Sequence, residues 1–233
     1  MVAVVLLLCL VTAVSSLKQG TSCTCHKDLV RIDDWILVFR VQADNRISAY
    51  QTWMNDAVYH DNPIIPWMIK PQCTSLRTSP RCHTHFKSRI VPMWEQANIK
   101  LVKVLLLKDS QKKAYILFNG IGSTKTSWFS RSRVINSTWS DLKTAPSNIF
   151  SIAGHQVLNR RFFMSSIYNG CAGDYFWMDI IDNNQGIMGC AWDKTTRFPK
   201  IIYSIKSTAA KTDSKLHNFE YADGMAVLVK LVQ

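Results

Sequence analysis

Hydrophobic positions along the chain come in short runs that polar and turn-forming residues interrupt. The run RIDDWILVFRVQ at 31–42 is rich in β-branched and aromatic residues, which is typical of a β-strand. Comparable runs predict strands at 99–109, 113–120, 148–154, 160–166, 174–182, 200–206 and 225–232. Asn-Gly and Asp-Gly turn signals lie between several of them. The pattern therefore predicts many short strands.

One stretch has a helical period instead. Apolar residues between Ile47 and Ala57 recur at spacings of three and four, which favours one short amphipathic helix. Residues 60–92 hold five of the seven prolines and predict a long irregular segment. A hairpin is the simplest interpretation of 99–120. Together these patterns predict a mainly β fold, a sandwich or a large antiparallel sheet with one short early helix, with an α+β fold as the alternative.

The first sixteen residues, MVAVVLLLCLVTAVSS, are apolar and end in small residues. They predict a secretory signal peptide at 1–16, because the run is shorter than the roughly 20 residues that span a membrane. A cysteine-containing segment at 17–30 then precedes a single β-rich domain at 31–233. We therefore expect a secreted, extracellular protein with no membrane span.

Six of the seven cysteines remain after removal of such a peptide: Cys23, Cys25, Cys73, Cys82, Cys171 and Cys190. An even number in a secreted chain predicts disulfide bonds. Cys171 and Cys190 are the two cysteines of the last third, and we favour that pair. Cys23 and Cys25 would then reach Cys73 and Cys82.

The net charge of +12 is not spread evenly along the chain. Residues 62–173 hold sixteen Lys and Arg against three Asp and Glu, while both flanks are nearly neutral. Such a basic segment attracts acidic polymers, so we expect acidic polysaccharides or acidic matrix proteins as partners, with adsorption to a mineral surface as an extension and no nucleic acid in vivo. The first candidates for anion contacts are Lys87, Arg89, Lys125, Arg131, Arg133, Arg160 and Arg161.

Two tryptophans, Trp128 and Trp139, lie in a polar stretch beside these arginines. Aromatic faces stack on sugar rings, so both are candidates for a glycan surface. Asn136 begins the sequon Asn-Ser-Thr and is a candidate glycosylation site, which predicts an exposed position.

The chain lacks the nucleophile, zinc-protease and phosphate-loop motifs of common enzymes, so a non-catalytic protein is expected. His83 and His85 leave open acid–base chemistry in a basic hydrolase, or a small metal site. Asp182 and Asn184 place oxygen atoms at alternate positions before a glycine, which makes them candidates for calcium binding. No other cofactor is expected.

A family resemblance rests on a series of short motifs. They are residues 35–40, Tyr50, Trp53, Phe118-Asn119-Gly120, residues 127–130, residues 137–142, Arg161-Phe162-Phe163, Gly170-Cys171, residues 190–193 and Phe198-Pro199. In this combination the chain resembles an uncharacterised secreted domain of molluscs and cnidarians, similar to unassigned proteins of shell and skeletal organic matrix. A weaker likeness is to fibrinogen-related domains. The resemblance implies no catalytic residue.

These observations predict a secreted, non-catalytic binding or structural component of an invertebrate extracellular or biomineral matrix. Its basic segment at 62–173 would bind acidic polymers. One alternative is a lectin-like glycan-recognition protein of mucus or innate immunity, and another is a basic secreted hydrolase or toxin.

Overall fold

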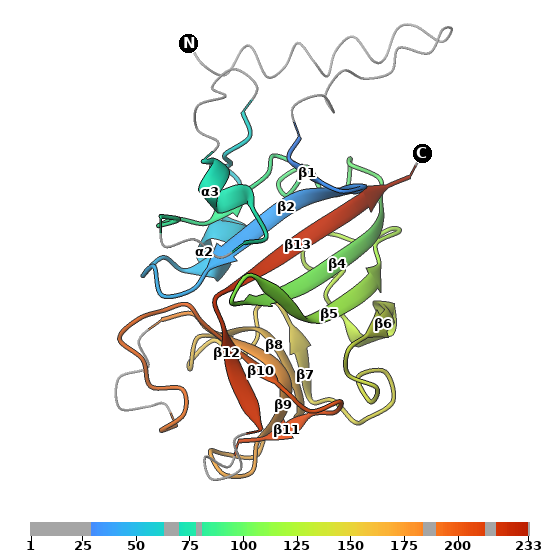
Figure 1. Cartoon of the computed structure of the whole chain (residues 1–233). Helices are drawn as coiled ribbons and strands as arrows, with labels where there is room; N and C mark the ends of the chain where they lie inside the picture. Colours follow the sequence, from blue (N-terminus) through green and yellow to red (C-terminus); the bar gives the residue numbers. More distant parts are fainter. Residues whose placement is uncertain (1–28, 63–69, 78–80, 184–189, 213–217, 233) are drawn as a thin grey trace, which may run out of the picture.

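The computed structural model of the chain describes residues 29–62, 70–77, 81–183, 190–212 and 218–232. Two antiparallel sheets form the framework of this part of the chain, and its α-helices are short (Figure 1). The mainly β prediction is therefore confirmed. The sheets pack face to face in a sandwich-like arrangement, with sheet A in the upper half of Figure 1 and sheet B in the lower half.

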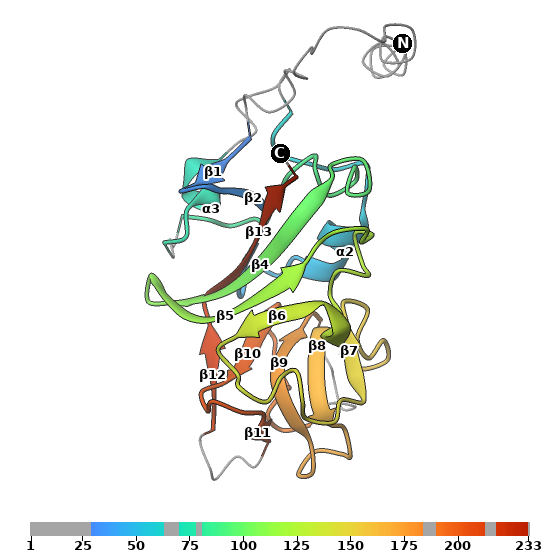
Figure 2. The same ribbon diagram turned by 90° about the vertical axis from the view of Figure 1, so that its right-hand side faces the viewer.

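Sheet A has seven strands in the order β1-β2-β13-β4-β5-β6, and β3 also pairs with β2. Its strands are β1 (Arg31–Ile32), β2 (Trp35–Gln42), β3 (Phe86–Lys87), β4 (Ile99–Lys108), β5 (Gln111–Asn119), β6 (Val134–Ser137) and β13 (Gly224–Leu231). The last strand along the chain, β13, thus lies between β2 and β4 in the middle of the sheet (Figure 2).

Sheet B has six strands in the order β12-β10-β9-β8-β7, and β11 also pairs with β9. Its strands are β7 (Ile149–Ser151), β8 (Arg160–Ile167), β9 (Tyr175–Ile181), β10 (Lys200–Ser204), β11 (Ala210–Lys211) and β12 (Phe219–Ala222). The chain returns from β12 to β13 through Asp223, which joins the two sheets at that point.

The hairpin predicted at 99–120 is formed by β4 and β5. Asp109 and Ser110 connect the strands, and both have a positive φ, 51° and 61°. Two central residues with positive φ are the geometry of the tight turns that match the twist of a hairpin, and Asp tolerates this region better than most residues. A short polar pair between two apolar runs was therefore sufficient to predict the hairpin from the sequence.

The inner faces of both sheets meet in one hydrophobic core. Alternate residues of β4, such as Val102 and Val104, point into it from sheet A, while Phe162 and Ile180 do so from sheet B. The helix α2 (Ala49–Met54) adds Trp53, whose ring lies 5.2 Å from that of Phe39. The predicted amphipathic helix is therefore present, and its apolar face closes the core.

The described residues of the segment 70–87 flank β2, and Leu76 packs against the outer hydrophobic cluster of sheet A. The segment contains the short helix α3 (Pro71–Thr74) and strand β3, and the Cys73–Cys82 disulfide closes it on itself. The prediction that Cys23 and Cys25 reach these two cysteines is therefore wrong. The chain turns back within nine residues and brings the two Cα atoms to 5.0 Å, a distance that suits a disulfide. Cys23 and Cys25 themselves lie outside the described residues.

Candidate functional site

The part of the outer face of sheet A that this segment leaves uncovered forms a groove of about 450 Å³. We call it the lysine–tryptophan groove. Trp35 of β2, Leu228 of β13 and Leu105 of β4 belong to one outer hydrophobic cluster and line it. Cross-strand pairing places Lys103 opposite both Leu228 and Leu117, so its side chain is on the same face. The groove therefore crosses the strands instead of following one of them.

Cationic side chains cover the aromatic part of this groove. The Lys103 ammonium lies 3.8 Å from the ring centroid of Trp35, and that of Lys230 lies 4.9 Å away. Both distances suit cation–π contacts. Lys112 and Lys113 of β5 also line the groove, and both are exposed. An apolar floor with several positive charges above it is a typical setting for an anionic ligand with an apolar body.

Two carboxylates, Asp33 and Asp34, stand at the edge of the groove and balance part of this charge. Asp34 accepts a hydrogen bond from Lys230, which lowers the pKa of Asp34. Burial lowers the pKa of Lys103, and the nearby charges of Lys112 and Lys230 lower it further against the opposite effect of Asp34. A bound anion would counter this repulsion among the lysines.

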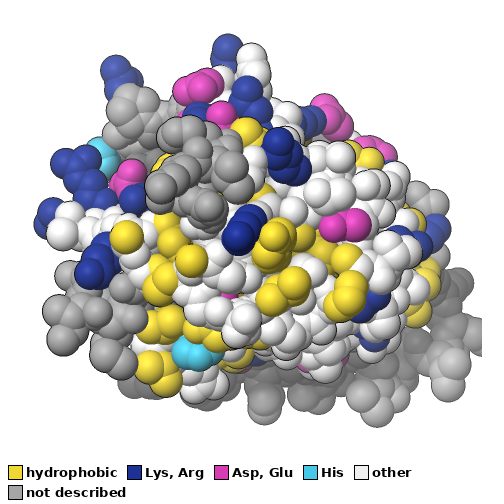
Figure 3. Space-filling model, turned by 90° about the horizontal axis from the view of Figure 1, so that it is seen from below, with side chains coloured by type: hydrophobic (Ala, Val, Ile, Leu, Met, Phe, Trp, Pro, Cys, Tyr) yellow, Lys and Arg dark blue, Asp and Glu magenta, His cyan; other side chains and the backbone are white. Residues whose placement is uncertain are grey.

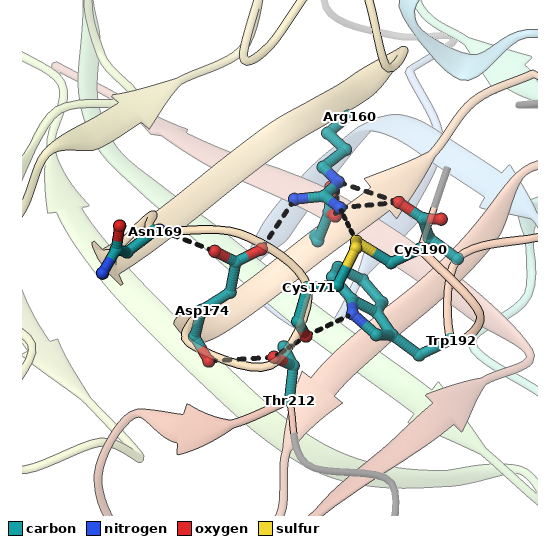
Figure 4. The surroundings of a disulfide bond; sticks show 9 residues. Arg160, Asn169, Cys171, Asp174, Cys190, Trp192 and Thr212 are labelled. Atoms are coloured by element: carbon teal, nitrogen blue, oxygen red, sulfur yellow. Dashed lines mark hydrogen bonds and ion pairs between the residues drawn. A yellow bond between two sulfur atoms is a disulfide. The ribbon is translucent and has the colours of Figure 1, made fainter. Parts of the chain in front are cut away.

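A second cation–tryptophan contact lies within sheet B, around Arg160 of β8 (Figure 4). The Arg160 guanidinium donates to Asp174 at 3.1 Å and to Asp193 at 2.7 Å. It also lies 4.4 Å from the ring centroid of Trp192 and 3.3 Å from the Cys190 sulfur. Arg160, Asp174 and Asp193 are all fully buried.

A third carboxylate completes this Arg160 cluster. Asp179 of β9 lies 3.8 Å from the Arg160 Nε, and neither of its oxygen atoms has a hydrogen-bond partner among the described residues. Burial raises the pKa of Asp179 well above its usual value, and Asp193 and Asp174 add to the effect. Burial alone would lower the pKa of Arg160, but Asp179 and Asp193 raise it overall. Arg160 is therefore enclosed with its counter-ions inside the fold and acts as a structural cation, while Asp179 stays without a hydrogen bond in this part of the chain.

The Cys171–Cys190 disulfide closes the loop over this cluster, as predicted from the sequence. Cys171 lies just before β9, in the loop after β8, and its carbonyl accepts hydrogen bonds from the Trp192 indole and the Thr212 hydroxyl (Figure 4). The bond therefore fixes the loop that carries Trp192 and Asp193 onto the outer face of sheet B.

The residues predicted to bind anions are largely engaged inside the fold. Lys87 is fully buried, and its ammonium donates to the carbonyls of Thr52 and Asn55 at the end of α2. Burial lowers the pKa of Lys87 to about 8. As described above, Arg160 is buried as well. Both were predicted as surface cations, and both predictions are wrong because these cations have partners within the fold.

The other five candidates also have internal partners. Arg161 is buried, donates to the Ala153 carbonyl and stacks on Tyr50 at 4.3 Å. Arg89 donates to the Asp61 carbonyl and its backbone N–H to the Asp61 carboxylate, and Lys125 pairs with Asp56 at 2.6 Å. These three therefore hold loops in place.

Arg131 and Arg133 form part of a 3₁₀ turn before β6. Arg131 donates to the Lys143 carbonyl and Arg133 to the Ile121 carbonyl, at 2.9 and 2.8 Å. Both are half-buried. Their guanidinium groups thus satisfy backbone oxygens of neighbouring turns, a role that sequence cannot distinguish from anion binding.

Trp128 and Trp139 are core residues, exposed by 0% and 2%, so neither offers a glycan surface. The Trp128 indole donates to the Lys125 carbonyl and the Trp139 indole to the Ser204 carbonyl. Their polar neighbours in the sequence, such as Ser127 and Ser140, are exposed. A polar flank therefore does not show that a tryptophan is exposed.

The Asp182 carboxylate caps α2 from the other sheet. It accepts hydrogen bonds from the Ser48 hydroxyl and from the backbone N–H groups of Ala49 and Tyr50, at 2.5, 2.6 and 2.8 Å. Burial raises the pKa of Asp182 to about 6, against these hydrogen bonds, which lower it. Calcium would have to displace these donors, and Asn184 lies outside the described residues.

The two histidine candidates, His83 and His85, differ in burial. His85 is 1% exposed, and burial lowers its pKa to about 4. Its Nδ1 accepts from the backbone N–H of Gln42, and its Nε2 lies 2.8 Å from the Ile47 carbonyl. His83 is exposed, so the two rings lie in different environments. Among the described residues, no group of three or more His, Cys, Asp or Glu side chains is placed to hold a metal ion.

The groove residues were not singled out from the sequence, although one signal was present. Lys103 interrupts an otherwise apolar stretch of β4. A lysine in such a place packs its alkyl chain on the apolar surface and keeps its ammonium group in contact with solvent or with a charged partner. On the face seen in Figure 3, several Lys and Arg side chains gather toward the left edge, and hydrophobic and uncharged side chains occupy much of the centre. The charge therefore does not form one continuous surface there.

Comparison of the chain with protein-family models, with curated proteins and with solved structures finds no match. In the described part of the chain, no helix has the length and apolar character needed to cross a membrane.

Proposed function

We propose that this chain is a secreted binding protein that holds acidic polysaccharides in the lysine–tryptophan groove. The single observation that carries the proposal is the meeting of Lys103, Lys112 and Lys113 with two aromatic rings, Trp35 and Tyr115, in one groove. Sulfate or carboxylate groups pair with ammonium groups, and the apolar face of a sugar packs on an aromatic ring. These lysines belong to the basic segment 62–173.

The two disulfides support the extracellular part of the proposal, because such bonds persist in oxidising compartments. In an invertebrate shell, skeleton or other extracellular matrix, the protein would act by binding and not by catalysis. The polysaccharide would carry the acidic groups that hold calcium, while this chain would link it to the matrix. Acidic matrix proteins are the competing partners.

The test is the binding of heparin, as a probe, to the protein secreted from a eukaryotic host. Replacing Lys103, Lys112 and Lys113 together by Ala is expected to weaken binding at least about tenfold at physiological salt, because it removes the charges that face the ligand. The matched control replaces three exposed lysines outside the groove by Ala: Lys143, Lys194 and Lys206.

The control removes the same net charge and is expected to change affinity by less than about twofold. Equal losses in both variants would mean that net charge alone attracts the polymer, which would overturn the groove as the site. Stronger binding of polyaspartate than of heparin would show acidic proteins to be the ligand class.

A lectin-like function has one observation in its favour. A second cleft, of about 530 Å³, is lined by Tyr50 and Phe150 together with hydroxyl groups of Ser127, Ser130 and Ser151. Rings and hydroxyls suit a neutral sugar. Binding that survives high salt, is competed by a neutral sugar and is lost in Tyr50→Ala would favour this second function.

A further inference from the structure

The Asn136 sequon lies on the strand at the edge of sheet A. Asn136 is exposed in β6, which pairs on one side with β5. In that pairing Asn136 is opposite Leu117, a member of the outer hydrophobic cluster. Directly opposed residues of an antiparallel pair point to the same face. Asn136 therefore points to the outer face, as Leu117 does.

The same row continues across the sheet to the groove. Leu117 is opposite Lys103, and Lys103 is opposite Leu228. Asn136 is thus two strands from Lys103, a distance of about 10 Å at the usual strand spacing. The nitrogen that would carry a glycan consequently stands on the same face as the Lys103 ammonium, at a separation comparable with the length of one disaccharide.

The sequon also contributes directly to the groove. Thr138, its third residue, is one of the lining residues. The Thr138 hydroxyl accepts a hydrogen bond from the Tyr115 backbone N–H, and the Thr138 N–H donates to the Tyr115 carbonyl, both at 3.0 Å. Asn136 precedes Thr138 by two residues, so the glycosylation site lies next to a residue that lines the groove. A glycan on Asn136 would begin at the rim of the groove.

We propose that N-glycosylation of Asn136 regulates the lysine–tryptophan groove by covering its β6 side and reducing access for acidic polysaccharides. This inference rests on the proposed function of the groove. A branched glycan excludes a second polymer from the space it occupies, and it does so without changing any residue that contacts the ligand. One chain would then exist in a strongly binding form without the glycan and a weakly binding form with it.

The experiment compares heparin binding by three secreted proteins: the wild type, Asn136→Gln, and Asn136→Gln combined with Lys194→Asn. The last change creates a new sequon with Thr195 and Thr196, in the loop that packs on the outer face of sheet B. It moves the glycan away from the groove and keeps the glycan mass. Mass spectrometry establishes the occupancy at each site.

We expect Asn136→Gln to bind heparin about tenfold more tightly than the glycosylated wild type, a difference of about 1.4 kcal/mol in binding free energy. The variant with the relocated glycan is expected to bind like Asn136→Gln. Enzymatic trimming of the wild-type glycan to its first sugar should recover most of the affinity. All three results together support the inference.

Two results would overturn the inference and leave the proposed function intact. One is equal binding by the wild type and Asn136→Gln while the triple lysine variant still loses affinity. The other is an unoccupied Asn136 in the secreted wild type. Absence of heparin binding by Asn136→Gln would instead overturn the proposed function, and the inference with it.

Discussion

The outer faces of the two sheets each place a cation over a tryptophan, and they differ in what neutralises it. On sheet B, Arg160 lies over Trp192 and is enclosed with Asp174 and Asp193. On sheet A, Lys103 lies over Trp35 in a groove open to solvent. The first cation has its counter-ions inside the fold, whereas the second has room for an external one.

A cation–tryptophan contact therefore does not by itself mark a binding site. The Arg160 side chain is fully buried, and two of its ion pairs are 3.1 Å or shorter. Such a pair is costly to break because removal of one partner leaves a buried charge. A groove lysine has no such constraint, so its replacement should affect binding more than folding.

The largest expected effect is that of Arg160→Met. It leaves the Asp174 and Asp193 carboxylates buried without their cation, and we expect a loss of about 3–5 kcal/mol in the free energy of unfolding. Urea titration followed by tryptophan fluorescence measures it. The control is Arg161→Met at the next position, where the acceptors are the neutral Ala153 carbonyl and the Asn159 amide oxygen. An equal loss in both variants would contradict the special role of the cluster.

Removal of the Cys171–Cys190 disulfide by replacement of both cysteines with Ser should cost about 3 kcal/mol, because the bond restricts the unfolded chain over a separation of nineteen residues. The Cys73–Cys82 disulfide spans a separation of only nine residues, so its removal should lower the free energy of unfolding by less. Thermal unfolding of both variants, each with its other disulfide intact, gives the order. The reverse order would show that the segment closed by Cys73–Cys82 on sheet A contributes more to stability than the loop closed by Cys171–Cys190 on sheet B.

Asp179→Asn is expected to stabilise the protein at neutral pH. The pKa of Asp179 is raised in the folded state, so the folded chain retains this proton at pH values where the unfolded chain has lost it. The stability of the wild type should therefore fall as the pH rises above about 4, and an amide removes this penalty. Urea midpoints at pH 3 and pH 7 measure the effect. A gain of the same size at both pH values would exclude proton linkage as its cause.

The smallest effect on stability is expected for Lys103→Met, below about 1 kcal/mol, because one partly exposed cation–π contact is lost and an apolar side chain of similar length replaces it. Heparin affinity should nevertheless decrease. Urea unfolding and heparin binding of one preparation separate the two quantities. A stability loss as large as that of Arg160→Met would remove the distinction between the two faces.

Much of the fold could be predicted from local patterns. The hairpin at 99–120, the helix near Trp53 and the Cys171–Cys190 pair depend on alternation, period and chain proximity, which are visible in the sequence. The short strands β3, β6, β11 and β12 were not predicted, since they hold their shape by pairing with distant partners and not by their own propensity.

The site could be predicted only as a charge excess in the middle of the chain. Arg160 and Lys103 are equivalent in that count, but the aspartates that enclose Arg160 are 14 and 33 residues away from it. The groove, in turn, brings Trp35, Lys103 and Leu228 together from three strands. Which cation is enclosed and which is open depends on sheet order, which local sequence patterns do not reveal.

The central place of β13 in sheet A has a consequence for how the protein is made. Its neighbours β2 and β4 are synthesised well over a hundred residues earlier, yet they are joined only when Gly224–Leu231 inserts between them. Leu228 then completes the lining beside Trp35 and Lys103. Contacts so distant along the chain form slowly. A growing or truncated chain would therefore lack the groove, and ligand binding would begin only with the fully folded molecule.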